Sequence, residues 1–143
     1  MGLMKIFDIA GSGLTAQRVR MEVAASNVVN AETTRTPEGG AYRPRRVTFE
    51  SSRPSFSKEL GRLMQEPAVG VEVVQISSSN EPPVMRYDPG HPDADGEGYV
   101  AYPDVDPVAE MVDMTSAVRS YQANVTVIQV AKAMAGAVLS LLR

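Results

Sequence analysis

The apolar residues in the first part of the chain recur every seven positions. They form two lines, which run through Phe7, Leu14, Met21 and Val28 and through Leu3, Ala10, Ala24 and Ala31. Gln17 is the single interruption of the second line. The pattern predicts a helix over residues 3–31 that packs along a partner helix. Gly11 and Gly13 each cost about 1 kcal/mol relative to alanine in a helix, so the first turns depend on that packing.

The stretch ASNVVNAETTRTPEGG, residues 25–40, is expected to end this helix. Its asparagines and threonines offer the backbone competing side-chain hydrogen bonds, its proline fixes φ, and its glycines permit positive φ. The sequence therefore predicts a helix stop followed by a turn into a different kind of structure.

Between residues 41 and 107 the hydrophobic period changes from helical to alternating. Three β-branched or aromatic segments predict strands. They are YRPRRVTFES (42–51), VGVEVVQI (69–76) and GYVAY (98–102). Residues 51–67 suit either a short helix or an ordered loop, and DPGHPDADGEG, residues 88–98, consists almost entirely of turn formers. The middle of the chain is therefore expected to be a small β-rich module.

The helical pattern returns after Asp106, which is placed to cap a helix that begins at Pro107. Two apolar lines then continue to the end of the chain, with Lys132 as the single break. They are Met111, Val118, Val125 and Leu139, and Met114, Tyr121, Ile128, Ala135 and Leu142. A helix of about 36 residues spans about 54 Å, which is longer than a compact domain of this size needs.

The last half of this helix has little polar surface. Its polar or small residues lie on one narrow stripe, formed by Thr126, Gln129, Lys132, Gly136 and Ser140. Such a helix needs burial on most sides, and the N-terminal helix covers only one of them. Insertion into lipid is disfavoured, because Lys132 near the centre costs about 2.5–3.5 kcal/mol. We therefore expect no direct membrane insertion, and burial against other copies of the chain.

These zones predict an α+β fold with two parts. Long N- and C-terminal helices, in residues 1–35 and 107–143, form a discontinuous helical domain paired as a coiled-coil-like stalk. Residues 36–106 form a small β-rich outer module.

Composition excludes several function classes. The 143 residues carry a net charge of −3, and the basic cluster Arg43, Arg45 and Arg46 is too small to indicate nucleic acid binding at that charge. The absence of cysteine excludes disulfides and thiolate metal sites. The opening MGLMKIFDIAGSG lacks the regions of a cleaved Sec signal, so we expect any export to use another route.

The one candidate for site chemistry is the loop of residues 88–98. It contains Asp88, His91, Asp93, Asp95 and Glu97. The spacing does not fit a calcium loop of the EF-hand type, and no nucleophile elbow accompanies His91. We interpret the loop as a polar turn whose carboxylates cap local amides. No catalytic residue, cofactor or metal is expected, and a small metal-binding protein that uses this loop stays an alternative.

Two long stretches resemble the rod and hook axial proteins of the bacterial flagellum. They are FDIAGSGLTAQRVRMEVAASNVVNAETTRTPEGGAYRPRRVTF and YDPGHPDADGEGYVAYPDVDPVAEMVDMTSAVRSYQANVTVIQVAKAM. The SYQANVTV segment and the asparagine-rich helix end are similar to axial proteins generally. GHPDADGEGYVAYPDVD resembles the proximal rod family in particular, although another axial or adaptor protein stays possible. Val29 stands where that family more often has a small residue.

The resemblance implies a structural subunit, not an enzyme, that stacks helically with copies of itself and other rod proteins to transmit torque from motor to hook. It implies a place in the periplasm-spanning rod of the basal body, next to ring or base proteins. It also implies export by the flagellar type III apparatus without signal cleavage. Assembly roles fall on matched motif and seam positions. They are Ala25, Ser26, Asn27, Asn30, Ala31, Thr33, Met111, Val118, Ser120, Tyr121, Gln122, Ala123, Asn124, Val125 and Ile128.

Overall fold

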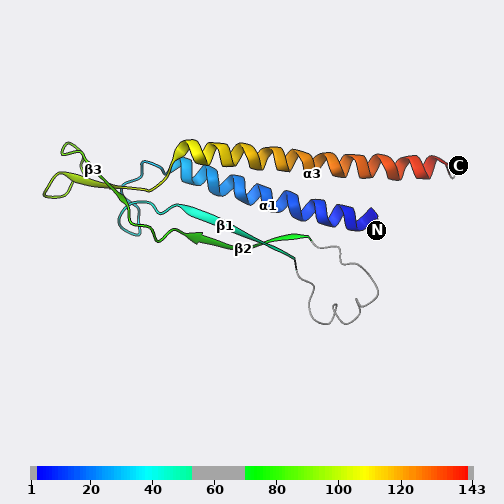
Figure 1. Ribbon diagram of the computed structural model, residues 1–143, viewed down its shortest axis with the longest axis horizontal. Coiled ribbons are helices and arrows are strands. Elements are labelled where there is room, and N and C mark those ends of the chain that lie inside the picture. Colours follow the sequence, from blue (N-terminus) through cyan, green and yellow to red (C-terminus); the bar gives the residue numbers. More distant parts are fainter. Residues whose placement is uncertain (1–2, 53–69, 142–143) are drawn as a thin grey trace, which may run out of the picture.

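The molecule is long and narrow, with two antiparallel helices lying side by side along most of its length (Figure 1). The computed structural model describes residues 3–52 and 70–141. Helix α1 spans Leu3–Val29 and helix α3 spans Pro107–Leu141. Between them come strands β1 (Arg45–Ser51), β2 (Val71–Ser78), β3 (Val84–Tyr87) and β4 (Tyr99–Tyr102). This is the α+β arrangement that the sequence predicts.

Helix α1 faces its partner with the predicted seven-residue lines. Ala10 and Ala24 are buried, and the larger side chains Phe7, Leu14 and Met21 are half-buried. Gln17 belongs to the same seam, where its Oε1 atom is buried without a hydrogen-bond partner among the described residues. The helix ends at Val29, within the stretch that predicts a stop.

Helix α3 uses a seam that differs from the predicted one by one position. The line of Met114, Tyr121, Ile128 and Ala135 is half-buried as expected, but Met111, Val118 and Leu139 are exposed. Their place at the seam is taken by Glu110, Ala117, Asn124 and Ala131. The prediction was wrong here because it chose the more apolar line, whereas closely approaching helices favour the smaller side chains and the polar ones that find partners on α1.

The ends of α3 and α1 near the hairpins are capped as their sequences predict. The Oδ1 atom of Asp106 accepts a hydrogen bond from the backbone N of Val108 at 2.9 Å, just before Pro107 in the first turn. At the other end, the Nδ2 atom of Asn30 donates to the carbonyl of Ser26 at 2.8 Å. These contacts fix where the chain enters and leaves the helical pair.

Strands β1 and β2 form an antiparallel hairpin that runs beside α1 (Figure 1). Their register pairs Arg45 with Ser78 and Ser51 with Val71, with an irregularity after Thr48. The Oγ atom of Ser12 accepts a hydrogen bond from the backbone N of Val71 at 3.1 Å, which ties the far end of the hairpin to α1. The predicted helix or loop of residues 51–67 lies almost wholly outside the described residues.

Strands β3 and β4 form a second, separate antiparallel hairpin at the end of the molecule. The sequence did not predict β3, because it is four residues long and follows two prolines. It forms because β4 needs a hydrogen-bonding partner, with Val84 paired to Tyr102 and Tyr87 to Tyr99. The β-rich part of the chain is therefore two hairpins in different places.

The buried apolar core is small. Among the described residues it consists of Ala10, Ala16, Ala24, Val100, Ala117 and Ala131. Five of these six are alanines, so the helices approach closely but remove little apolar area from water. Most of the large apolar side chains of α3 lie outside this core and are exposed.

Candidate assembly surface

The side chain of Asn27, which is 1% exposed, joins both helices and the first hairpin. Its Nδ2 atom donates to the backbone O of Arg45 at 2.9 Å and to Oε1 of Glu110 at 3.1 Å. Its Oδ1 atom accepts from the backbone N of Arg45 at 2.9 Å and from the hydroxyl of Tyr42 at 3.0 Å. All four hydrogen-bonding positions of the amide are therefore used. We call Asn27 with these three partners the Asn27 junction.

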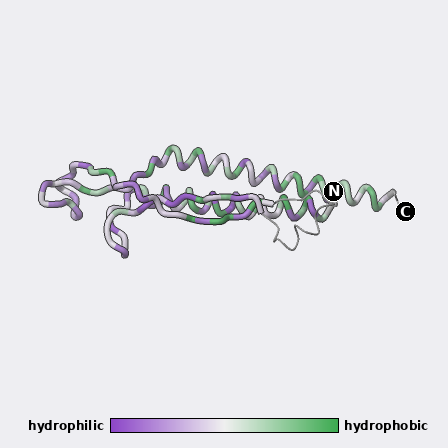
Figure 2. The backbone as a smooth tube through the Cα atoms, turned by 60° about the horizontal axis from the view of Figure 1, so that its bottom comes forward, coloured by the Kyte–Doolittle hydropathy of each residue, from purple (hydrophilic) through white to green (hydrophobic). Residues whose placement is uncertain are grey.

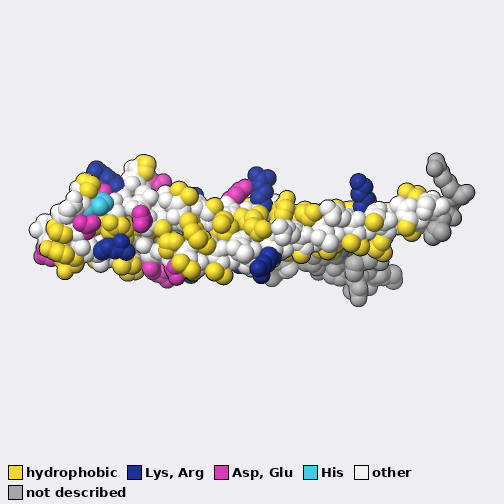
Figure 3. All heavy atoms as spheres, turned by 90° about the horizontal axis from the view of Figure 1, so that it is seen from above, with side chains coloured by type: hydrophobic (Ala, Val, Ile, Leu, Met, Phe, Trp, Pro, Cys, Tyr) yellow, Lys and Arg dark blue, Asp and Glu magenta, His cyan; other side chains and the backbone are white. Residues whose placement is uncertain are grey.

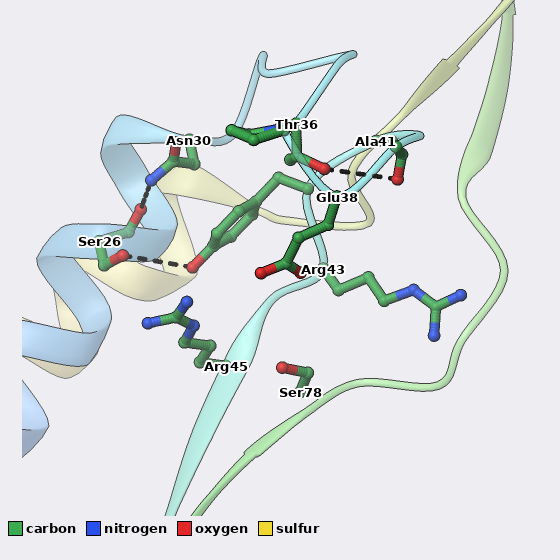
Figure 4. Close-up of a pocket in the computed structure, with 11 residues that line it drawn as sticks. Ser26, Asn30, Thr36, Glu38, Ala41, Arg43, Arg45 and Ser78 are labelled. Atoms are coloured by element: carbon green, nitrogen blue, oxygen red, sulfur yellow. Dashed lines mark hydrogen bonds between the residues drawn. The ribbon is translucent and has the colours of Figure 1, made fainter.

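The other motif residues at the end of α1 extend this junction toward the turn of residues 36–40. Figure 4 shows Ser26 and Asn30 beside a cavity of about 340 Å³, with Arg45 and Ser78 on its hairpin side. The hydroxyl of Ser26 lies 3.3 Å from that of Tyr42, and Thr33 donates to Oδ1 of Asn30 at 3.3 Å. Ala25 and Ala31 are half-buried. The motif thus fixes how the chain leaves the helix.

Two contacts set how α1 and α3 lie against each other. Arg20 on α1 donates from Nε to Oδ2 of Asp113 on α3 at 2.9 Å, and from Nη2 to Oδ1. These hydrogen bonds raise the pKa of Arg20, against the opposing effect of burial. At Gly13, an added Cβ would lie 2.8 Å from Nδ2 of Asn124. The glycine therefore lets the asparagine side chain lie directly against the backbone of α1.

The motif residues of α3 divide between the seam and the surface. Tyr121, Asn124, Val125 and Ile128 are half-buried on or next to the seam, and Ser120 is half-buried with its hydroxyl on the carbonyl of Ser116 at 3.0 Å. Gln122 and Ala123 are exposed, as are the predicted seam residues Met111 and Val118. The structure therefore brings only part of the predicted set together within one chain.

Helix α3 leaves apolar side chains exposed along its whole length. We call these side chains together the α3 outer surface, and they are Val108, Met111, Val112, Val118, Val127, Val130, Met134, Val138 and Leu139. Met134 and Leu139 are 62% and 67% exposed. Figure 2 shows hydrophobic residues recurring along α3 toward the C-terminus, and Figure 3 shows the acidic groups of that face gathered toward the hairpin end, with basic groups spaced farther along the helices. A surface of this length is typical of an interaction site.

Helix α3 is long and apolar enough to cross a membrane, by length and composition alone. Only 6% of this apolar span is buried inside the described structure. Burial in lipid is disfavoured, because Lys132 in this helix is charged and exposed. The surface instead suits other helices, because alanine and glycine are interspersed with its valines and methionines.

The loop of residues 88–98 has the turn structure that the sequence predicts. The Oδ1 atom of Asp95 accepts from the backbone N of Glu97 at 2.9 Å and of Tyr99 at 2.8 Å. Asp93 accepts a hydrogen bond from the hydroxyl of Thr34 at 2.8 Å, and His91 accepts one from the backbone N of Asp93. No cluster of three or more metal-ligating side chains occurs in the part of the chain that the structure describes.

Sequence reasoning missed Glu110, Asp113, Arg20 and Gly13 as contact residues. Glu110 and Asp113 are the only acidic residues of α3, and both lie on its α1-facing side. Glu110 lies four residues before Met114, and Asp113 lies four residues before Ala117, a helical spacing that could have indicated them. Tyr42 carried no such signal, because its contact with Asn27 depends on the turn between them.

These features define a class of elongated subunit that packs with other subunits along an axis. Its two terminal helices are joined to the first hairpin by a buried amide, and α3 leaves apolar side chains exposed. Comparison with known proteins agrees. The family described as "Flagella basal body rod protein" matches residues 7–35, and "Flagellar basal body rod FlgEFG protein C-terminal" matches residues 97–141.

Full-length relatives narrow the class further. A protein of Escherichia coli O6:H1 named flagellar basal-body rod protein FlgC is 45% identical over 135 residues, covering 94% of this chain and 93% of its own length. Proteins of the same name from Borreliella burgdorferi and Bacillus subtilis are 41% and 42% identical, covering 100% and 89% of this chain and 99% and 89% of their own lengths. The chain belongs to the FlgC family of flagellar basal-body rod proteins.

Proposed function

We propose that this protein is a polymerising structural subunit of the flagellar rod, and that its work is mechanical rather than enzymatic. The observation that carries the proposal is the α3 outer surface. Among the described residues the apolar core consists of five alanines and one valine, whereas most of the larger apolar side chains of α3 are exposed to water. Those side chains gain burial only when neighbouring subunits cover them.

In this proposal the two parts of the chain have different roles. Residues 1–35 and 107–143 form the assembly domain, which packs with neighbouring subunits around the rod axis. Residues 36–106 form the outer part. The Asn27 junction connects the two parts, so a load applied to the first hairpin passes into both helices through the hydrogen bonds of the Asn27 side chain.

The assembly roles proposed for the motif residues follow this division. Asn27, Asn30, Ser26 and Thr33 shape the subunit by fixing the end of α1. Gln122 and Ala123 are exposed and are available to neighbouring subunits, as are Met111 and Val118. Tyr121, Asn124 and Ile128 set the distance between the two helices.

The partners are other copies of the chain and other rod proteins, with ring or base proteins of the basal body at the rod's surface or end. The chain reaches this place through the flagellar type III export apparatus, without signal cleavage. Support for these partners comes from membership in the FlgC family, because the relatives carry the name of a basal-body rod protein.

The test is to place a charge on the α3 outer surface. Val130→Asp and Met134→Asp should each abolish incorporation of the protein into basal bodies, since a carboxylate would have to be buried between subunits. The matched control is Val74→Asp, which changes a similarly exposed valine on β2. Swimming and immunoblots of purified basal bodies give the readout in cells whose own copy is deleted.

The proposal fails if the two α3 variants enter basal bodies as well as the wild-type protein does. Circular dichroism of each purified variant checks that the substitution leaves the secondary structure of the isolated chain unchanged. A loss of incorporation with an unchanged spectrum assigns the defect to the surface between subunits.

A further inference from the structure

Helix α1 also has a line of exposed residues that the rest of the described structure does not cover. Asp8, Thr15, Glu22 and Val29 repeat every seven residues on the side away from both α3 and the first hairpin, and all four are exposed. Val29 is 81% exposed, although it is large and apolar. Gly11 lies between Asp8 and Thr15, and an added Cβ there would meet nothing within 4 Å. We call these four residues the α1 outer line.

One flank of α3 repeats with the same period. Met111, Val118, Lys132 and Leu139 are exposed and Val125 is half-buried, so this α3 flank has one charge among four apolar side chains. Asp8 and Val29 are separated by 21 positions, and so are Met111 and Lys132. On both helices this separation corresponds to about 32 Å.

Building on the proposed function, we propose that the α3 flank packs antiparallel on the α1 outer line of a neighbouring copy, with Lys132 paired to Asp8 of that copy. In this register Met111 lies opposite Val29, so the two exposed apolar side chains at the other end cover each other. Thr15 and Glu22 then face Val125 and Val118. Gly11 leaves room for the neighbouring helix to approach closely.

The charge on Lys132 selects this register. Covering the α3 flank removes the ammonium group from water, which is costly unless a carboxylate accompanies it. Two carboxylates lie on the α1 outer line. Glu22 already holds Arg18, with Oε1 at 2.9 Å from Nε, whereas Asp8 has no ion-pair partner within the described residues.

The lengths of the helices favour the same choice. If Lys132 were paired with Glu22 instead, α3 would shift by two heptads, or about 21 Å, along α1. Met111 and Val118 would then both lie beyond Val29, the last residue of α1, so two of the five flank residues would lose their cover. Pairing with Asp8 keeps the two helices overlapped over their full common length.

Cysteine cross-linking tests the register directly, because the natural chain contains no cysteine. A chain carrying both Asp8→Cys and Lys132→Cys should, on oxidation of assembled basal bodies, give a ladder of covalently linked copies on a non-reducing gel. Co-production of the two single variants should give linked dimers only. The control pair, Thr15→Cys with Lys132→Cys, is displaced by one heptad and should give much less product.

A second pair guards against loss of assembly through removal of the two charges. Val29→Cys with Met111→Cys belongs to the same register and leaves Asp8 and Lys132 in place. Its control is Val29→Cys with Val118→Cys. The two cysteine pairs that belong to the proposed register should both link copies, and each displaced control pair should give much less linked product.

The register is wrong if rods assemble but the cysteine pairs link no copies, if they link only within one chain, if they link this chain to a different rod protein, or if the displaced controls react equally well. These outcomes leave the proposed function intact, because they require assembled rods. Failure of the proposed function is recognised separately, by normal incorporation of Val130→Asp and Met134→Asp.

Exchange of the charges gives an independent readout. Asp8→Lys and Lys132→Asp should each reduce swimming, because each places like charges opposite one another between copies. The two substitutions combined in one chain should restore swimming toward the wild-type level. A double variant that swims no better than the worse single variant contradicts the pairing.

Discussion

At the scale of single residues, the carboxamide of Asn27 acts as a substitute peptide group. It bonds to both the N–H and the C=O of Arg45, as a neighbouring strand would, and in this way receives β1 at the end of a helix. An aspartate has the same shape but lacks the two donor hydrogens, and would bring a second carboxylate next to Glu110. The amide is therefore the side chain that suits this buried position.

We predict that Asn27→Ala destabilises the junction by more than a single hydrogen bond contributes. The change removes the side-chain partner of both backbone groups of Arg45 in a part-buried place, and each such group costs about 1–3 kcal/mol. The hydroxyl of Tyr42 loses Asn27 and keeps the hydroxyl of Ser26 as a neighbour. Urea unfolding followed by circular dichroism measures the loss. Asn30→Ala, which removes two local hydrogen bonds, one to the carbonyl of Ser26 and one from the hydroxyl of Thr33, is the control and should cost about 1 kcal/mol. Equal effects of the two variants would contradict the central role of Asn27.

At the scale of elements, the helix pair depends on how closely α1 and α3 approach. Gly13 and Gly11 are two residues apart in the same helix but have different surroundings, since Asn124 lies against Gly13 and open space lies beside Gly11. Substituting each of these two glycines in turn therefore separates the intrinsic cost of glycine in a helix from its contribution to helix packing.

We predict that Gly11→Ala raises the free energy of unfolding of the isolated chain by about 1 kcal/mol, as expected from helix propensity alone. Gly13→Ala should give none of this gain and lower the stability instead, because Asn124 has to leave its place against the backbone of α1. Thermal unfolding monitored at 222 nm compares the two. If both variants are stabilised alike, the close approach at Gly13 is unimportant.

The elements themselves could be predicted from the sequence to different extents. Helices were found because periodicity and capping at Asp106 are local signals, and β1, β2 and β4 were found from their β-branched or aromatic residues. Strand β3 was missed because only its pairing with β4 makes it a strand. The predicted seam of α3 differs from the observed seam by one position. Ala117 and Asn124 lie in the observed seam because they fit against the surface of α1, and the hydrophobic pattern of α3 carries no information about that surface.

At the scale of the whole molecule, little holds the far end of the helix pair together in a single chain. The C-terminal turns of α3 continue past the beginning of α1 (Figure 1), and the exposed side chains there include Val138 and Leu139. At the opposite end, the Asn27 junction and the hairpins fasten both helices. The stability of an isolated subunit is therefore uneven along its length.

We predict a gradient in amide hydrogen exchange along α3 in dilute, unassembled protein. Amides near Glu110 and Ala117 should exchange slowly, whereas those after about residue 132 should exchange fast, because isolated helical turns are marginal in water. In purified rods the same C-terminal amides should become strongly protected. Strong protection of the whole helix in the dilute subunit would show that the surface needs no neighbours.

The Asn27 junction has a consequence for how such a rod responds to its surroundings. Three of the four hydrogen bonds of the amide join uncharged groups, and the side chain is 1% exposed, so dissolved ions do not screen these hydrogen bonds. A contact between copies that uses Lys132 and Asp8 is screened to the extent that water reaches it. A change in ionic strength would thus alter the cohesion between subunits while leaving the shape of each subunit unchanged.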